Sequence, residues 1–515
     1  MSKMTDSLKL IYKFVIETMQ PNSLIHSSIR IGATGSLEIV KTLQRKKNPI
    51  YTTSRTRCFH NWSWYDRIII DRSIQNQSAL FHSVSSGKAA MGMCQALLEQ
   101  IDNYNQNVEK SSNLNIPLIE IRFGQLNVPF GIKSSNKKLL FKYNTNYFEC
   151  GYNNLPDEYS LNNTAKLLDS MRKKLPNANK PLIIGLLSGG GSSLLSLPGE
   201  NLSLLDKRKT IEKLVQKGAN IFELNSVRGC LSEVKHGQLA VKCLEWNPSC
   251  EMITLIISDV CDDSLETIAS APTVLPSRFV QNSTMDAMEV LRKYSIRLED
   301  HILNCIRKKM QMFAENRRFE STSFQNIIIG NNSLALRVAQ TKAQTLGFKS
   351  ILIENCFQGE AKLIVEKLLD MALSYVISPD DRLRYNGILW IAGGEATIRM
   401  DSCDRIGLGG RCQEMGLLFL RAMNRTSNRN KDRPMFALFA GTDGQDGPTP
   451  VAGVSVQWPI ESKFQNKNHW SALERALLEH DSYNYWKQSA KENFLVTEMT
   501  GTNVMDIYLV SIPFD

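Results

Sequence analysis

A run of glycines and serines follows an apolar segment near the middle of the chain. Residues 187–193 read LSGGGSS, and residues 181–187 are typical of a buried strand. Glycines let a backbone approach an anion closely and turn its N–H groups toward it, and serine hydroxyls add donors. The run therefore indicates an anion site, although it does not fit the P-loop pattern G-x-x-x-x-G-K-[ST]. A tight strand-to-helix turn without a ligand is the alternative. The residues expected to bind phosphate or substrate here are Ser188, Gly189, Gly190, Gly191 and Ser192.

Three cations elsewhere in the first half of the chain could serve the same anion. Lys88 lies in residues 86–90, SGKAA, where small residues open a helix at the expected end of a strand. Arg228 and Lys235 lie close together in the sequence, and Asn225 precedes them. Phosphoryl transfer depends on positioning and on cations that neutralise charge, so it requires side chains of this kind. Taken alone, each cation is more often a surface residue.

A second glycine group lies in the C-terminal quarter. Residues 393–395 read GGE directly after the strand-like residues 387–391, and residues 407–414 read GLGGRCQE. These glycines would permit close backbone contact with a ligand, and Arg411 offers a planar guanidinium that fits phosphate or carboxylate. Hairpin turns and an ordinary surface arginine are the alternative. The position of the cluster after a strand favours a binding site.

Carboxylates follow two further strand-like segments. Asp259 comes directly after residues 252–257, and Asp443 and Asp446 lie in GTDGQDG, residues 441–447. Carboxylates at strand ends, with glycines between them, suit a magnesium ion that also bridges phosphate oxygens. Each could instead form an Asx turn, which is common for Asp-Gly pairs. Asp259 is the stronger candidate of the three because it follows its strand immediately.

Other catalytic groups find no support in the sequence. Of the seven histidines only His236 falls within these segments, and none pairs at H-x-x-x-H spacing. No G-x-S-x-G motif occurs. A zinc hydrolase and a Ser-His-Asp hydrolase are therefore not indicated.

Short β-branched runs alternate with segments of helical periodicity along the whole chain. This alternation predicts an α/β protein with largely parallel sheets, in which ligands bind at the carboxyl ends of the strands. Residues 378–386, starting Ser-Pro-Asp-Asp, are the best boundary between a large and a small α/β unit. We therefore expect an N-terminal domain over residues 1–377 and a C-terminal domain over residues 386–515.

The composition is that of a globular protein without a nucleic-acid or membrane partner. The 515 residues are 42% hydrophobic and 22% charged, and the net charge of +10 is a mild basic bias spread over a long chain. No apolar run reaches the roughly 18 to 20 residues that a membrane helix needs. The eleven cysteines contain no C-x-x-C pair, which favours free thiols in a reducing compartment. A cytoplasmic location is expected, with mitochondrial import kept open by the basic residues 30–57.

At this point the motifs resemble those of a known family, the glycerate kinases of the animal and bacterial type with a C-terminal MOFRL domain. The resemblance is collinear from about residue 8 to residue 510. Its main motifs are GKAA at 87–90, LSGGGSS at 187–193, NSVR at 225–228, SDV at 258–260, GGE at 393–395, GGRCQE at 409–414, TDGQDGPT at 442–449 and TGTNV at 500–504.

The resemblance implies a Rossmann-like N-terminal domain, a smaller MOFRL domain and an active site in the cleft between them. It also implies ATP-dependent phosphorylation of D-glycerate, most often to 2-phosphoglycerate, with Mg²⁺. The proposed catalytic residues of the family correspond to Lys88, Asp259 and Arg411. With ATP as donor, the remaining glycines and acids become the expected nucleotide contacts: Gly393, Gly394, Glu395, Gly409, Gly410, Glu414 and Asp443. Asp259, Asp443 and Asp446 are the expected metal ligands.

Several glycines of the family pattern are replaced in this chain. Lys-Gly-Gly becomes Lys235-His236-Gly237, Ser-Gly-Pro-Thr becomes residues 270–273, SAPT, and the glycine after Ser-Asp-Val is lost in residues 261–263, CDD. Where such a glycine held a positive φ, its replacement costs about 1 kcal/mol or more of backbone strain. The charged residues survive, so the changes bear on affinity and rate. A ligand-binding protein that has lost catalysis, and a kinase for another small hydroxy acid, are the alternatives.

Overall fold

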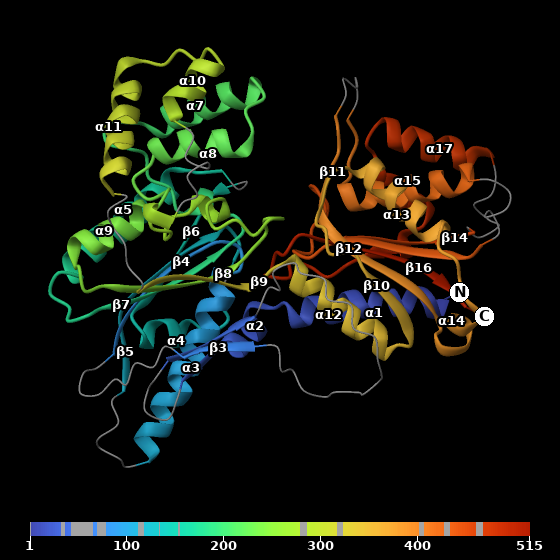
Figure 1. Ribbon diagram of the computed structural model, residues 1–515, viewed down its shortest axis with the longest axis horizontal. Helices are drawn as coiled ribbons and strands as arrows, with labels where there is room; N and C mark the ends of the chain where they lie inside the picture. The colour runs from blue at the N-terminus through green and yellow to red at the C-terminus, as the bar shows by residue number, and fades with distance from the viewer. Residues whose placement is uncertain are drawn as a thin grey trace. The chain divides into compact units, whose positions relative to one another are not determined.

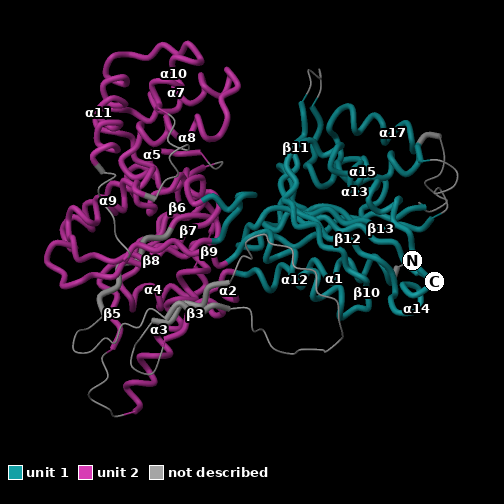
Figure 2. Tube along the Cα trace, viewed as in Figure 1, with its two compact units in different colours: residues 1–20, 257–264, 330–515 teal, residues 21–256, 265–329 magenta. Residues whose placement is uncertain are grey.

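The structure is a computed structural model in which the chain folds into two compact units (Figures 1 and 2). Unit 1 comprises residues 1–20, 257–264 and 330–515, and unit 2 comprises residues 21–256 and 265–329. The structure describes residues 2–31, 37–42, 65–69, 79–111, 118–132, 134–152, 155–278, 286–316, 323–400, 406–426, 433–459 and 467–514.

Unit 2 is built on a six-stranded sheet. Its strands lie in the order β6 (Thr145–Cys150), β5 (Ile119–Pro129), β4 (Ala79–Ser86), β7 (Leu182–Ser188), β8 (Glu251–Ile257) and β9 (Phe324–Gly330). The pairs β4–β5, β4–β7 and β5–β6 are parallel. All seven residues of β7 are buried, which explains its continuous apolar sequence. Numbered along the chain, the order is 3-2-1-4-5-6, which is the strand order of Rossmann folds.

Two groups of helices accompany this sheet. α5 (Glu158–Lys174) and α9 (Gln238–Trp246) share a buried core with β7 and β8, and α3 (Ala90–Lys110) packs beside β4, β5 and β7. A separate cluster is formed by α7 (Leu204–Gln216), α8 (Ile221–Cys230), α10 (Ala287–Lys293) and α11 (Asp300–Asn316). Capping boxes at Ser203 and Asn220 fix the starts of α7 and α8. The remaining elements of unit 2 are α2 (Pro21–Ser28), β1 (Ile29–Ile31), β2 (Leu37–Thr42), β3 (Tyr65–Ile69), α4 (Lys137–Lys142), α6 (Gly191–Leu194), η2 (Ile268–Ser270) and η3 (Pro276–Arg278).

Unit 1 has a mixed sheet rather than a parallel one. The strand order is β10 (Phe348–Leu352), β12 (Gly387–Thr397), β16 (Asp506–Pro513), β13 (Met435–Gly441), β14 (Gly453–Trp458) and β15 (Phe494–Leu495), with β11 (Phe357–Glu360) also paired to β12. Only β10 and β11 are parallel to β12. The expectation of largely parallel sheets is wrong here, because the last strand of the chain lies between β12 and β13 and is antiparallel to both.

Helices cover both faces of this mixed sheet (Figure 1). On one face α13 (Ala361–Leu373) and α15 (Arg411–Arg425) pack on a core that includes Trp390, Phe419 and Phe439. On the other lie α1 (Ser2–Thr18) and α12 (Asn332–Thr345), which pack against each other. Unit 1 also contains α14 (Pro379–Arg384), α17 (Lys467–Leu478), α18 (Ser482–Ser489) and η5 (Lys491–Asn493).

The division into compact units does not follow the expected domain boundary. Residues 330–377 belong to unit 1 together with residues 386–515, and so do residues 1–20. The segment 378–386, expected to be a connection, contains α14, which begins at a capping box on Ser378. No helix in the described part of the chain is long and apolar enough to cross a membrane.

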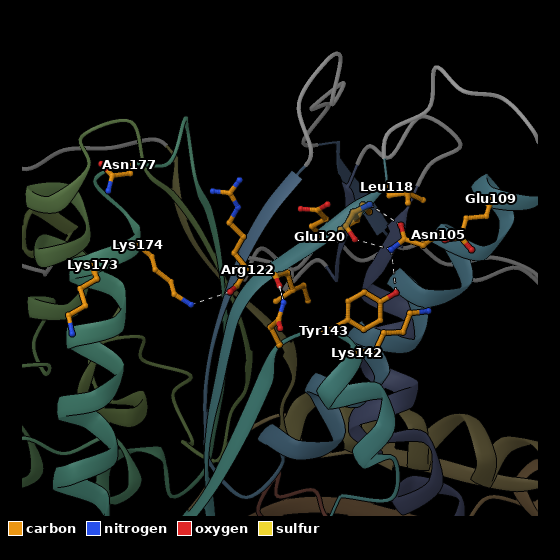
Figure 3. A pocket seen from close by; sticks show the side chains of 13 residues that line it. Asn105, Glu109, Leu118, Glu120, Arg122, Lys142, Tyr143, Lys173, Lys174 and Asn177 are labelled. Atoms are coloured by element: carbon orange, nitrogen blue, oxygen red, sulfur yellow. Dashed lines mark hydrogen bonds between the residues drawn. The ribbon is translucent and has the colours of Figure 1, made fainter.

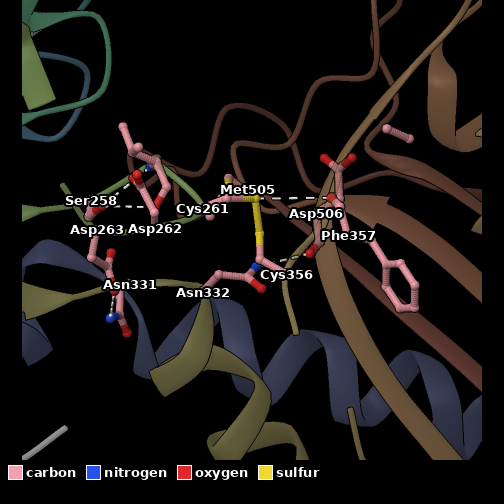
Figure 4. The surroundings of a disulfide bond; sticks show 12 residues. Ser258, Cys261, Asp262, Asp263, Asn331, Asn332, Cys356, Phe357, Met505 and Asp506 are labelled. Atoms are coloured by element: carbon pink, nitrogen blue, oxygen red, sulfur yellow. Dashed lines mark hydrogen bonds between the residues drawn. A yellow bond between two sulfur atoms is a disulfide. The ribbon is translucent and has the colours of Figure 1, made fainter. Parts of the chain in front are cut away.

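The cysteines also depart from the sequence-based expectation. Cys261 and Cys356 form a disulfide within unit 1, so the prediction of free thiols throughout is wrong for this pair (Figure 4). Their Cα atoms are 5.6 Å apart, whereas 95 residues separate them in the sequence, and only the fold brings them together. The free cysteines among the described residues are Cys94, Cys150, Cys230, Cys243, Cys250, Cys305 and Cys412, all of them buried.

Candidate functional site

The glycine loop and Lys88 meet at the point where the strand order of unit 2 reverses. β4 and β7 are neighbours in the middle of the sheet, with earlier strands on one side and later strands on the other. Both run in the same direction, so the loops after Ser86 and Ser188 leave the same edge. In open α/β sheets, the crevice at such a switch point is where ligands bind.

Hydrogen bonds join the two loops directly. The backbone N–H of Lys88 donates to the carbonyl oxygen of Gly189 at 2.9 Å, and that of Ala89 donates to Oγ of Ser188 at 2.9 Å. Gly87 permits this approach, because its φ is +132° and a Cβ there would lie 2.1 Å from Oγ of Ser188. The side chain of Lys88 is thus carried on the loop that contacts the glycine run.

The glycine run turns into a single helical turn. Gly190 has a φ of +81°, and α6 ends at Leu194. Since α6 has only four residues, the anion-binding capacity of this loop comes from its backbone N–H groups and serine hydroxyls rather than from a helix dipole.

A segment with unfavourable backbone φ values, residues 269–271, contacts the turn α6. Ala269, Ser270 and Ala271 all have φ values between 50° and 60°, a conformation that costs about 1 kcal/mol or more for each non-glycine residue. Ser270 Oγ lies 2.9 Å from Oγ of Ser192. Side chains in such a conformation persist only where their surroundings hold them, and they gather at functional sites.

Two of the replaced glycines sit at left-handed positions, as the strain argument requires. His236 has a φ of 57° and Ala271 a φ of 53°. Their backbones are held by neighbours: the N–H of His236 donates to the carbonyl oxygen of Ser270 at 2.9 Å, and the N–H of Gly237 to that of Ala271 at 2.7 Å. In residues 261–263, where the third glycine is lost, Asp263 has a φ of 52°.

Lys235 is a buried cation attached to the glycine run. Its Nζ donates to both the carbonyl oxygen and Oγ of Ser192 at 2.5 Å, and only 3% of the residue is exposed. Burial, followed by the charges of Lys207 and Arg228, holds the pKa of Lys235 well below its usual range. Arg228 itself is half-buried and donates to Oδ1 of Asn225 at 3.3 Å. The structure therefore brings the predicted residues of unit 2 into one neighbourhood.

In unit 1, Arg411 is fixed by acidic partners. Its Nε and Nη2 donate to the two carboxylate oxygens of Asp506 at 2.7 and 2.9 Å, and Nη1 donates to Glu395 at 3.1 Å. Burial disfavours the charge of Arg411, but the carboxylate of Asp506 outweighs it and holds the pKa of the guanidinium above its usual range. These hydrogen bonds fix the orientation of the Arg411 guanidinium, and a third of the side chain is exposed.

Two predicted acids of unit 1 have structural partners. Both carboxylate oxygens of Asp446 accept backbone N–H groups at the start of α15, from Cys412 at 3.0 Å and Gln413 at 2.8 Å. Burial raises the pKa of Asp446 to about 6. Glu414 contacts Nδ1 of His480 at 3.0 Å, and burial raises its pKa. Hydrogen bonds to the start of α15 explain the position of Asp446 without a metal ion.

The other two carboxylates predicted as metal ligands lie in strand-end loops. Asp259 is half-buried just after β8, in the loop that carries Cys261. Asp443 is half-buried after β13, and its Oδ1 accepts the N–H of Gln445 in an Asx turn. Among the described residues, no three His, Cys, Asp or Glu side chains are arranged to hold a metal ion. Assignment of Mg²⁺ to these carboxylates stays a prediction.

The C-terminal glycines lie against protein atoms. A Cβ on any of them would fall 2.1 to 2.5 Å from a neighbouring residue of unit 1. The neighbours are Asn332 for Gly393, Phe357 for Gly394, Ser482 for Gly409 and Asp446 for Gly410. Close packing explains these glycines as well as a nucleotide would, so nucleotide contact also stays a prediction.

A hollow of about 560 Å³ lies elsewhere in unit 2 (Figure 3). It is lined by residues at the start of β5, such as Glu120 and Arg122, and by Tyr143 just before β6. These are the amino ends of parallel strands, opposite to the edge that carries the glycine loop. The hollow is therefore not part of the candidate site.

Comparisons with known proteins agree with the motifs. Sequence models of two families match the chain, a domain of unknown function (DUF4147) over residues 14–307 and the MOFRL family over residues 388–506. A glycerate kinase of Rattus norvegicus is 30% identical over 487 residues, which cover 85% of this chain and 86% of the relative. A glycerate 2-kinase of Pyrococcus horikoshii is 33% identical over 367 residues, covering 70% and 76%.

Solved structures agree on the fold. The crystal structure of a glycerate kinase from Thermotoga maritima has a TM-score of 0.69 and 24% identity, and the match covers 99% of this chain and 100% of that one. The curated relatives of the chain are kinases, so the chain is a kinase, and the lysine and glycine loop at the switch point of its sheet are consistent with that class. The chain belongs to the glycerate kinase family with a C-terminal MOFRL domain, which confirms the resemblance.

Sequence reasoning missed three residues of these sites. Asp506 follows the motif at residues 500–504, but the motif does not reveal its partner, and only the antiparallel insertion of β16 brings it to Arg411. Ser270 contacts the glycine run from a segment 78 residues further along the chain. Lys207 lies on α7, where its sequence neighbours suggest an exposed helix, yet it is 5% exposed. No local signal in the sequence distinguishes Lys207 from the lysines around it.

Proposed function

We propose that the protein transfers the γ-phosphoryl group of ATP to D-glycerate, giving 2-phosphoglycerate and ADP. The observation that carries the proposal is the junction of Lys88 with the glycine run at the switch point of a Rossmann-ordered sheet. Backbone donors, serine hydroxyls and a buried lysine meet there, as the binding of an anionic substrate requires. Membership of the glycerate kinase family supplies the substrate class.

The predicted residues take three roles in this proposal. Lys88 and Arg411 offset the charge of the transferring phosphoryl group, which is the main contribution a protein makes to such a reaction. Asp259 orients the attacking hydroxyl or contributes to holding Mg²⁺. In the latter case Asp259 would hold the ion, which would supply neutralisation of phosphate charge. The glycine run, with Asn225 and Arg228, holds the glycerate carboxylate or a phosphate.

One observation favours a second candidate, a protein that binds the same ligands without turnover. His236 and Ala271 have left-handed backbones where the family pattern has glycine, so the loops beside the glycine run carry backbone strain that glycine would avoid. The presence of Lys88, Asp259 and Arg411 favours the kinase.

An ADP-release assay separates the two candidates. Purified full-length protein with MgATP is given D-glycerate, L-glycerate or no acceptor, alongside Lys88→Ala and the control Lys173→Ala, which changes a largely exposed lysine on α5. The kinase predicts ADP release that depends on D-glycerate, is lost in Lys88→Ala and is kept in the control. Ligand binding by calorimetry with no ADP release from any acceptor would establish the binding protein instead.

The position of phosphorylation has its own readout. Enolase acts on 2-phosphoglycerate directly, whereas 3-phosphoglycerate must first be isomerised by a mutase. Formation of phosphoenolpyruvate with enolase alone supports the 2-phosphoglycerate product. A requirement for added mutase would assign the 3-position.

A further inference from the structure

Three cations of unit 2 are gathered beside the glycine run without a counter-charge. Lys207 is 5% exposed and Lys235 is 3% exposed, and Arg228 is half-buried. In the described part of the chain, no carboxylate lies within ion-pair distance of any of the three. Asp206, which precedes Lys207, accepts from the N–H and Oγ of Ser203. Glu233, close to Lys235 in sequence, is engaged by Lys242 at 3.0 Å and Lys309 at 2.6 Å.

The bonds that these cations do make are to neutral groups. Nζ of Lys207 donates to Oγ of Ser196 at 2.9 Å, and Nζ of Lys235 donates to Ser192. Both serines lie on or just after α6, the turn that ends the glycine run. Each lysine therefore fixes one part of this turn while adding positive charge behind it.

Such an arrangement is costly unless an anion completes it. A buried charge without a partner opposes folding, and like charges placed together add to that cost. Besides burial, the charges of Lys207 and Arg228 lower the pKa of Lys235, and the charge of Arg228 lowers that of Lys207. The three positive charges therefore act on one another. A cluster of one sign, in a polar loop at a switch point, is suited to binding an oxyanion in a largely dry environment.

We propose that Lys207, Arg228 and Lys235 form the binding site for one anionic oxygen group of the substrates, and that Lys207 is a further positioning residue of this site. The group is the acceptor carboxylate or a phosphoryl group, which share this chemistry. Arg228, the most exposed of the three, contacts the oxygens. Lys207 and Lys235 hold the turn and supply charge from behind. The inference rests on the proposed function for the identity of these two ligands.

Lys207→Met tests the assignment, because methionine keeps the length of the side chain and removes its charge. Lys209→Met is the matched control, since Lys209 lies on the same helix and is exposed. Binding of D-glycerate, of inorganic phosphate and of a non-hydrolysable ATP analogue is measured by calorimetry on the full chain, so the result does not require turnover. Melting temperatures of both variants are recorded without ligand.

We expect Lys207→Met to weaken one ligand by about tenfold or more, as for loss of one charge-assisted interaction, with an unchanged or higher melting temperature. Weaker D-glycerate binding assigns the carboxylate, and weaker phosphate or nucleotide binding assigns the phosphoryl group. In turnover, KM for the affected substrate rises while kcat at saturation stays within about threefold.

Several results would overturn the proposal. One is wild-type affinity for all three ligands in Lys207→Met. Another is a fall in melting temperature of several degrees together with loss of all binding, which would make Lys207 a structural residue. Wild-type protein that binds none of the three anions also refutes it. If anions bind and depend on Lys207 but no ADP is released, the proposed function fails while the site stands.

Discussion

Replacing Lys207 by methionine should make unit 2 more stable at neutral pH. Burial, with a contribution from the charge of Arg228, lowers the pKa of Lys207 from its ordinary 10.5 to about 8. A difference of this size corresponds to roughly 3 kcal/mol that the charged lysine costs the fold at pH 7. The bond from Lys207 to Ser196 returns about 1 kcal/mol of this cost. Methionine removes both contributions, so we expect a net gain of about 2 kcal/mol.

The lowered pKa of Lys207 also predicts how the stability gain in Lys207→Met changes with pH. Because the pKa of Lys207 is lower in the folded chain than in the unfolded chain, the unfolded chain binds more protons between about pH 8 and pH 10.5. Charged Lys207 therefore destabilises the folded chain fully below pH 8. This destabilisation disappears as the pH rises to 10.5. The advantage of Lys207→Met should shrink across that window. A guanidinium is not deprotonated in this window, so Arg228 does not contribute, whereas Lys235, whose pKa burial also lowers, responds in the same direction as Lys207.

Thermal and urea unfolding at pH 7 and pH 10 measure the difference. A gain of about 2 kcal/mol corresponds to a rise of roughly 3–6 °C in the unfolding of unit 2 at pH 7. The control Lys209→Met should stay within about 0.5 kcal/mol of wild type at both pH values. A Lys207→Met variant that is less stable than wild type at pH 7, by an amount that does not change with pH, would refute the reasoning.

Three further outcomes follow from the contacts described above. Gly87→Ala should destabilise unit 2 by about 2–4 kcal/mol and abolish ADP release, since its Cβ would overlap Ser188; a wild-type urea midpoint would contradict this. Asp506→Asn should destabilise unit 1 by about 2–3 kcal/mol, because Arg411 loses its charged partner. Circular dichroism during urea unfolding measures this loss of stability. Cys356→Ser should lower stability by about 2–4 kcal/mol without reductant and by nothing measurable with it, and equal effects in both conditions would count against the disulfide.

Local patterns predicted the parts of the site that lie within one loop. β7 and the glycine run are adjacent in sequence, and the buried strand and the glycine loop after it follow from residue types alone. Lys88 was placed at a strand end because small residues around it open α3. In both cases, the chemistry and the backbone that positions it lie within about ten residues of each other.

Features that depend on distant partners were out of reach. The Cys261–Cys356 disulfide joins residues 95 apart, and nothing in the spacing of eleven cysteines selects that pair. Asp446 has the sequence surroundings of a metal ligand, yet its carboxylate caps a helix that begins 35 residues earlier, at Arg411. Lys207 is buried only because α7 packs with α8 beside α6, which a lysine-rich helix sequence does not reveal.

The placement of α1 has a consequence for how the chain folds as it is made. This helix is synthesised before the whole of unit 2, but its partners α12 and β13 follow unit 2 in the sequence, and the sheet beneath it is completed only by β16. Until then its apolar face, with Leu8, Ile11 and Val15, has no native surface to cover. Unit 2 can fold earlier, from residues 21–329. Synthesis therefore makes one helix of unit 1 before unit 2 and supplies the partners of that helix only after unit 2.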